Sequence, residues 1–170
     1  MTRRFGRVVW ITGLSGAGKT TVSKLIAAQL NAEGINPVIL DGDTIRQALP
    51  DLPGFDERSR RELAACYGRL AGEFAAQGHV VLCATVSMFH SAHAWNRANL
   101  PGYLEIWLRV PPNQLSGRDT KGVYGSGDQV VGMEIEPEFP REPDLVIDNY
   151  ASVSPEEAAA RVHALITGAR

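Results

Sequence analysis

Cysteine is scarce in this chain, and long apolar runs are absent from it. Its two cysteines, Cys66 and Cys83, form no C-x-x-C pair and have no ligand-spaced histidines nearby, which argues against a zinc site or a disulfide framework. We expect both to be small core residues in a reducing compartment. No apolar run approaches the roughly 20 residues that a membrane-spanning helix needs, and the first residues lack the apolar segment of a secretory signal. The sequence therefore predicts a cytoplasmic protein that does not engage membranes.

A basic excess is missing as well. The net charge is -2 at pH 7, and lysine and arginine are spread along the chain rather than massed. Proteins that neutralise many nucleic-acid phosphates usually carry a positive excess, so we expect no nucleic-acid partner. A length of 170 residues suits a single domain with one core, and we expect one domain over residues 1–170.

Short apolar runs alternate with helical patterns along the chain. Five runs rich in β-branched residues predict strands, at 8–12, 38–40, 80–85, 103–110 and 145–147. Apolar residues at helical spacing predict helices that begin at Lys19, cover 63–74, and follow Ser154 as an N-cap with Pro155 in the first turn. This alternation predicts an α/β fold, with a five-stranded, mostly parallel sheet and helices on both faces.

One long stretch fits neither pattern. Residues 118–141 hold four glycines and two prolines but few apolar residues. A connection of this length in a compact domain is typically disordered or a functional lid. We expect a mobile lid over about 118–141.

The run from Gly13 to Thr20 reads G-L-S-G-A-G-K-T and fits the pattern G-x-x-x-x-G-K-[ST]. A predicted strand precedes it and a predicted helix follows it, as a phosphate-binding loop (P-loop) requires. In such a loop, backbone N–H groups and a helix N-terminus surround phosphates, Lys19 reaches the β- and γ-phosphates, and Thr20 ligates Mg²⁺. The motif predicts a P-loop NTPase fold with ATP and Mg²⁺ as cofactors. The residues expected to contact ATP are Gly13, Ser15, Gly16, Ala17, Gly18, Lys19, Thr20, Thr21 and, from the lid, Arg118.

Asp41 and Asp43 directly follow the second predicted strand. Ligands in parallel sheets bind beyond the carboxyl ends of the strands, and alternation along an extended backbone points both carboxylates the same way. We expect one of the two acids to hold Mg²⁺ together with Thr20 and the other to accept the proton of an attacking hydroxyl. Asp41 is the preferred Mg²⁺ ligand and Asp43 the preferred base, and the exchanged assignment stays open. The competing interpretation is a turn followed by a helix N-cap.

Several of these runs resemble the adenylyl-sulfate kinase (APS kinase) family. They are the phosphate loop through Thr21, the run Leu-Asp-Gly-Asp-x-x-Arg ending at Arg46, Gly54-Phe55, and Arg-Asp-Thr-Lys-Gly-Val-Tyr at 118–124. The resemblance implies a phosphotransferase that moves the γ-phosphoryl group of ATP to the 3′-hydroxyl of a nucleotide acceptor. It assigns Lys121, with Lys19, Asp41 and Asp43, to catalysis, and a homodimer is common in the family. The acceptor contacts that it implies are Arg46, Phe55, Arg60, Ser87 and Lys121.

The departures from the family pattern concern the acceptor. Leu63 stands where the family has an asparagine, Val130 aligns with a phenylalanine that stacks on the acceptor base, and residues 86–90 read Val-Ser-Met-Phe-His in place of Ile-Ser-Pro-Tyr-Arg. The altered sequence is also similar to a divergent branch, the cytidine diphosphoramidate kinases. The runs that carry this second resemblance are Trp-Asn-Arg at 95–97, Val-Val-Gly-Met-Glu-Ile at 130–135 and Pro-Asp-Leu-Val-Ile-Asp-Asn at 143–149. The acceptor thus stays open between adenylyl sulfate and a related nucleotide. A non-catalytic P-loop nucleotide-binding module is a further alternative.

Other polar and aromatic residues carry weaker signals. The histidines lack metal-ligand spacing, and we expect His90 and His93 to be solvated loop residues, with acceptor contact as the alternative. Trp10 is expected in the core, whereas a pocket role for Trp95 stays open. The glutamates between 134 and 142 are expected to form a solvated edge that meets at most a basic lid residue.

Overall fold

The computed structural model describes residues 6–49, 54–118, 122 and 130–168. A five-stranded sheet lies at its centre, with strand order β2-β3-β1-β4-β5. Every neighbouring pair of strands is parallel, so the sheet is parallel throughout rather than mostly so. The strands are β1 (Arg7–Thr12), β2 (Val38–Asp41), β3 (Val80–Ala84), β4 (Leu104–Arg109) and β5 (Leu145–Asp148).

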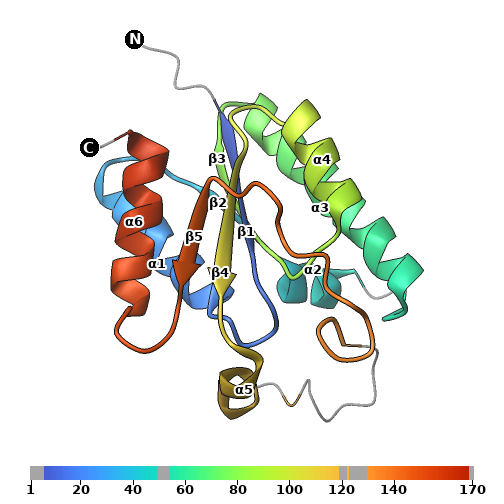
Figure 1. The fold of residues 1–170 in the computed structure, drawn as a ribbon. Helices are drawn as coiled ribbons and strands as arrows, with labels where there is room; N and C mark the ends of the chain where they lie inside the picture. The colour runs from blue at the N-terminus through green and yellow to red at the C-terminus, as the bar shows by residue number, and fades with distance from the viewer. Residues whose placement is uncertain (1–5, 50–53, 119–121, 123–129, 169–170) are drawn as a thin grey trace.

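Helices cover both faces of the sheet, as the alternation predicts. Figure 1 shows one pair of helices on one face and a second pair on the other. The first pair is α1 (Lys19–Ala32) and α6 (Pro155–Thr167), and the second is α3 (Glu57–Ala76) and α4 (His90–Asn99). The shorter elements are α2 (Gly42–Ala48), α5 (Pro112–Leu115) and the 3-10 turn η1 (Ser116–Arg118).

The helices α2, α4 and the four-residue α5 were not predicted. For α2 and α4 there is a physical explanation. α2 is short and has no buried residue, so it carries no hydrophobic period. α4 has the sequence HSAHAWNRAN, and the side chains that it buries are Ala92, His93 and Asn96. Because two of those three are polar, the inward face of α4 lacks the apolar spacing that predicts a helix.

The core forms a layer on each side of the sheet. Ile11, Leu82 and Ile106 project towards α1 and α6, while Trp10 and Cys83 project towards α3. Alternate residues of a strand point to opposite faces, so the central strands β1 and β3 contribute to both layers. The core position expected for Trp10 is confirmed.

The expectation for the cysteines is half correct. Cys83 is buried in β3, but Cys66 is exposed on α3. Cys66 and its buried neighbour Tyr67 are consecutive on the helix, and a step of one residue turns a side chain by about 100°. Cys66 therefore lies outside the buried stripe of α3.

The parallel arrangement places all five carboxyl ends of the strands at one edge of the sheet. The connections that leave this edge are the ones that build the site described below. Among the residues that the structure describes, no helix is long and apolar enough to span a membrane.

The described end of the predicted lid is more closely packed than its composition suggested. Val130, Val131 and Ile135 are each at most 5% exposed, and Val131 forms a bridge with Ile135. Residues 119–121 and 123–129 of the predicted lid lie outside the described residues.

The cap of α6 provides a test of the fold. Ser154 Oγ accepts a hydrogen bond from Glu157 N at 3.1 Å, as predicted for an N-cap. Ser154→Ala removes this acceptor and should lower the free energy of unfolding by about 1 kcal/mol in urea titrations. Ser154→Asp keeps a capping oxygen and should stay close to the unmodified protein. Equal losses in both variants would contradict the capping role.

Candidate active site

The phosphate loop connects β1 to α1 and turns on glycines. Gly16 and Gly18 have φ angles of 80° and 92°, in the left-handed region that favours glycine. A Cβ atom on Gly18 would also lie 2.6 Å from Asn149 Nδ2. Gly18 is thus required both by its backbone conformation and by a close neighbour from the end of β5.

Lys19 is the first residue of α1, and its side chain folds back over the loop. Its Nζ donates hydrogen bonds to Gly13 O at 2.8 Å and to Leu14 O at 2.9 Å. The ammonium group therefore lies beside the backbone that the motif assigns to the phosphates. The role of Lys19 in binding the β- and γ-phosphates stays a prediction.

Thr20 and Asp41 meet across the sheet edge. Thr20 Oγ1 donates to Asp41 Oδ2 at 2.6 Å. The other carboxylate oxygen, Asp41 Oδ1, accepts from Asp43 N at 3.0 Å and from Thr44 N at 3.4 Å, so Asp41 caps α2. The Mg²⁺-ligand and N-cap interpretations of Asp41 are thus compatible, because one carboxylate oxygen caps the helix and the other faces Thr20.

The geometry expected for Asp43 is wrong, although its location is not. Alternation along an extended backbone predicted that Asp41 and Asp43 point the same way. The backbone instead turns into α2 at Gly42, which places Asp43 in the first turn of a helix. Asp43 is exposed and lines the same pocket as Asp41.

A pocket of ≈ 530 Å³ lies at this edge of the sheet. One half, the nucleotide half, is formed by the phosphate loop, the start of α1 and Arg118. The other half, the acceptor half, is formed by α2, Phe55, α3, the segment after β3 and residues 130–131. The lining residues are Ser15, Gly16, Gly18, Lys19, Thr20, Thr21, Asp41, Gly42, Asp43, Arg46, Phe55, Arg60, Leu63, Tyr67, Ala84, Thr85, Val86, Ser87, Phe89, Arg118, Val130 and Val131.

Most of the predicted site residues therefore come together in one pocket. Gly13 and Ala17 do not line it, but they belong to the loop that forms its wall. Lys121 lies outside the described residues.

Two arginines flank the ring of Phe55 in the acceptor half. The Cζ atoms of Arg46 and Arg60 lie 4.5 Å and 5.4 Å from the ring centroid, and Arg60 Nε donates to Phe55 O at 2.7 Å. Cations over an aromatic face are held by the ring quadrupole. The result is a cationic wall suited to an anionic ligand, with the 43%-exposed ring as its apolar part.

The acceptor half also contains apolar side chains and hydroxyls. Leu63 and Val130 are each 4% exposed, and the hydroxyls of Thr85 and Ser87 lie 2.7 Å apart. Tyr67 donates its hydroxyl proton to Gly42 O at 3.2 Å. Burial raises the pKa of Tyr67 to about 12, so this phenol stays protonated near neutral pH.

The role of Asn149 was missed by the sequence analysis. Asn149 is 4% exposed, and its Nδ2 donates to Ala17 O at 2.8 Å. The backbone carbonyl oxygen of Asn149 accepts a hydrogen bond from Arg118 Nη1 at 2.8 Å. Asn149 thereby links the phosphate loop to Arg118. The signals in the sequence were its position just after an expected strand and its place at the end of the run 143–149.

The pocket is not lined by His90, His93 or Trp95. His93 was expected in a solvated loop, but it lies on α4 and is only 6% exposed, so that expectation is wrong. Trp95 is 38% exposed on the same helix, with Arg69 over its ring at 5.9 Å. The acidic edge also differs, because Glu138 pairs with Arg61 and His90 rather than with a lid residue.

The oxygens of Thr20 and Asp41 are suited to Mg²⁺, which prefers hard oxygen ligands, keeps several waters and uses few protein side chains. Among the described residues, no group of three or more histidines, cysteines or acids is arranged to hold a metal ion. A cation at this point would thus rest on one hydroxyl, one carboxylate and water.

Comparison with known proteins agrees with this geometry. A cytidine diphosphoramidate kinase of Campylobacter jejuni is 36% identical over 155 residues, which cover 88% of this chain and 90% of that protein. An adenylyl-sulfate kinase of Burkholderia ambifaria is 35% identical over 162 residues, which cover 91% of this chain and 89% of that protein.

A solved structure gives the same result. The APS kinase CysC of Mycobacterium tuberculosis, in complex with AMPPNP and APS, superposes with a TM-score of 0.87 at 31% identity, covering 95% of this chain and 98% of that one. These relatives are kinases, and this chain is an ATP-dependent phosphotransferase. Because the family model for adenylylsulphate kinase matches residues 5–148, the chain belongs to the adenylylsulphate kinase family.

Proposed function

We propose that this chain transfers the γ-phosphoryl group of ATP to the 3′-hydroxyl of a nucleotide other than adenylyl sulfate. Cytidine diphosphoramidate is the leading candidate. The observation that carries the proposal is the location of Leu63 and Val130 in the acceptor half of the pocket. The cytidine diphosphoramidate kinase among the relatives supports the same acceptor.

The cationic wall accounts for what the two acceptors share. Each guanidinium can donate a fork of hydrogen bonds to phosphate oxygens, and Arg46 and Arg60 together suit a diphosphate-like group. Phe55 offers an apolar surface between them to a sugar or a base. This wall fits adenylyl sulfate and cytidine diphosphoramidate equally.

The apolar side chains of the acceptor half account for the difference between the two acceptors. Leu63 offers no hydrogen-bond donor where the resembled family has an amide, and a lost hydrogen bond to a charged group is worth roughly 1.5–3 kcal/mol. Val130 offers no ring for stacking on a purine. Both losses weaken the binding of adenylyl sulfate.

Phosphoryl transfer in this pocket depends mainly on positioning and charge compensation. In the proposed mechanism the loop amides and Lys19 hold the β- and γ-phosphates, while Asp43 accepts the proton of the acceptor hydroxyl. Thr20 and Asp41 would hold Mg²⁺, which neutralises charge on the phosphates. Asn149 orients Arg118, which compensates charge from the nucleotide side together with Lys121 of the proposed lid.

The first prediction concerns Lys19. Lys19→Ala removes a preorganised cation, and turnover should fall by about 10²-fold or more. Lys24→Ala is the matched control, because Lys24 is exposed on the same helix and does not line the pocket. Steady-state ADP release with both variants checks this. Near-normal turnover in a folded Lys19→Ala protein would contradict the mechanism.

A second prediction separates the two acids. Asp43→Asn keeps the shape of the side chain but removes proton acceptance, so turnover should fall by ~10²–10⁴-fold with little change in ATP binding. Asp41→Asn should instead weaken Mg²⁺-dependent ATP binding, and since asparagine is also a good N-cap, α2 should persist. Calorimetric titration with and without Mg²⁺ measures binding. The reverse pattern would show that the two roles are exchanged.

A third prediction concerns acceptor choice. The unmodified protein should use cytidine diphosphoramidate, with a kcat/KM for adenylyl sulfate at least about tenfold lower. Leu63→Asn should raise kcat/KM for adenylyl sulfate by about one to two decades, whereas the apolar control Leu63→Val should not. Efficient turnover of adenylyl sulfate with micromolar KM, and none of the cytidine compound, would reject this acceptor assignment and leave the kinase activity intact.

A further inference from the structure

Residues 85–89 form part of the acceptor half without belonging to a helix or a strand. Thr85, Val86, Ser87 and Phe89 all line the pocket. Because such a segment has no ladder of its own, its backbone groups need partners from elsewhere in the fold. Thr12 Oγ1 donates to Val86 O, and Glu138 N donates to Met88 O at 3.1 Å.

The remaining side-chain contact to this backbone comes from His93 on α4. His93 Nε2 lies 2.9 Å from Ser87 O, which also accepts from Phe89 N at 3.1 Å. A carbonyl oxygen only accepts hydrogen bonds, so Nε2 carries the proton. Burial lowers the pKa of His93, and the nearby Glu105 carboxylate opposes this shift.

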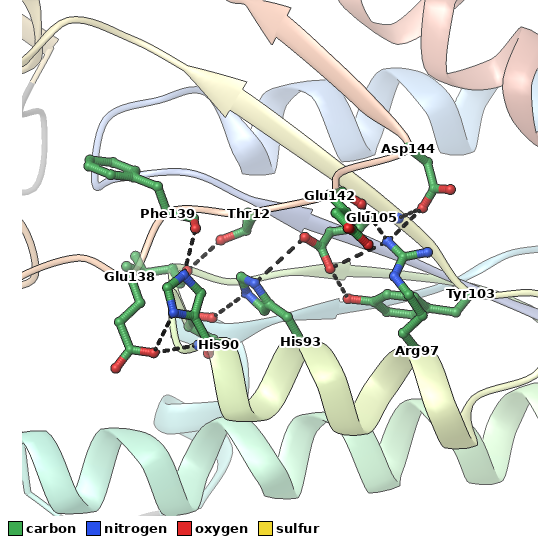
Figure 2. Close-up of polar contacts among 12 residues, drawn as sticks. Thr12, His90, His93, Arg97, Tyr103, Glu105, Glu138, Phe139, Glu142 and Asp144 are labelled. Carbon is green, nitrogen blue, oxygen red and sulfur yellow. Dashed lines mark hydrogen bonds and ion pairs between the residues drawn. The ribbon is translucent and has the colours of Figure 1, made fainter.

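A buried carboxylate lies near the other side of the ring, where Nδ1 makes no hydrogen bond within the described residues. Glu105 is 2% exposed on β4, and its Oε1 lies 3.6 Å from His93 Nδ1. Its Oε2 accepts from Tyr103 Oη at 3.0 Å and lies 3.7 Å from Arg97 Nη2. Figure 2 shows His93 between the Glu105 cluster and the backbone after β3. The imidazole is thus fixed between α4 and the sheet, with one nitrogen directed at Ser87.

We propose that His93 is a positioning residue of the acceptor site. It holds the Ser87 carbonyl, and through it the buried Thr85–Ser87 hydroxyl pair, in place on the floor of the acceptor half. The inference rests on the proposed function, since that function assigns this half of the pocket to the acceptor. Loss of the contact should weaken acceptor binding and leave the nucleotide half unchanged.

A set of substitutions at residue 93 separates positioning from packing. Glutamine places an amide nitrogen near the position of Nε2, and asparagine places one near the position of Nδ1, while leucine keeps only volume. His163→Leu is the matched control, because His163 lies on α6 on the opposite face of the sheet and pairs with Glu33 at 2.9 Å. Each variant is compared for its KM values and for its urea unfolding.

With cytidine diphosphoramidate and adenylyl sulfate each as acceptor, His93→Leu and His93→Asn should raise the acceptor KM about tenfold, the effect of one lost hydrogen bond. The KM for ATP should stay unchanged, and His93→Gln should recover most of the acceptor KM. His163→Leu should alter stability without altering either KM. An unchanged acceptor KM in His93→Leu, or a glutamine variant no better than leucine, would overturn the inference.

A spectroscopic measurement keeps this test separate from the proposed function. If the unmodified protein phosphorylates neither compound, the proposed function fails, and ¹⁵N NMR of the His93 imidazole then decides the positioning contact. A protonated Nε2 whose hydrogen exchanges slowly supports it. A proton on Nδ1 alone, or rapid exchange at Nε2, would overturn it.

Discussion

The hydrogen bond from Thr20 Oγ1 to Asp41 Oδ2 is the contact on which the two halves of the pocket depend. Thr20 follows β1 and Asp41 ends β2, and β3 lies between these strands in the sheet. Because all strands are parallel, both residues nevertheless reach the same edge. The contact places the phosphate loop beside the helix that carries Asp43. Because Oδ1 of Asp41 caps α2, the carboxylate is held in place while Oδ2 faces Thr20.

Much of the pocket wall around this contact is irregular backbone, and buried polar side chains hold it. Asn149 fixes the phosphate loop from the end of β5, and His93 fixes the segment after β3 from α4. Each is at most 6% exposed, and each uses a single directed hydrogen bond to a carbonyl. Fixing the loops in this way lowers the reorganisation that phosphoryl transfer would otherwise require. The nucleotide half and the acceptor half thus have separate supports, and changes in one need not disturb the other.

Local sequence patterns were sufficient for the strands, for α1, α3 and α6, and for the phosphate loop, because each has its own hydrophobic period or motif. They were insufficient where polar residues are buried. α4 was missed because His93 and Asn96 occupy its inward face, and the Asp41–Asp43 geometry was wrong because the backbone turns into α2 at Gly42 instead of staying extended.

The acceptor contacts, in contrast, were accessible only through the family resemblance. Arg46, Phe55, Arg60 and Ser87 come from separate elements, and no local pattern brings them together. The part played by Asn149 depends on a contact between residues 132 positions apart in the chain. No pattern within a short window contains that information.

The central claim is that one pocket transfers the γ-phosphoryl group of ATP directly to a nucleotide acceptor. Its most direct test follows the γ-phosphoryl group itself, with γ-labelled ATP and cytidine diphosphoramidate, and locates the label in the product by ³¹P NMR. The account predicts label on the 3′-oxygen of the acceptor, in amounts equal to the ADP released. Label recovered as inorganic phosphate, at a rate that the acceptor does not change, would contradict it.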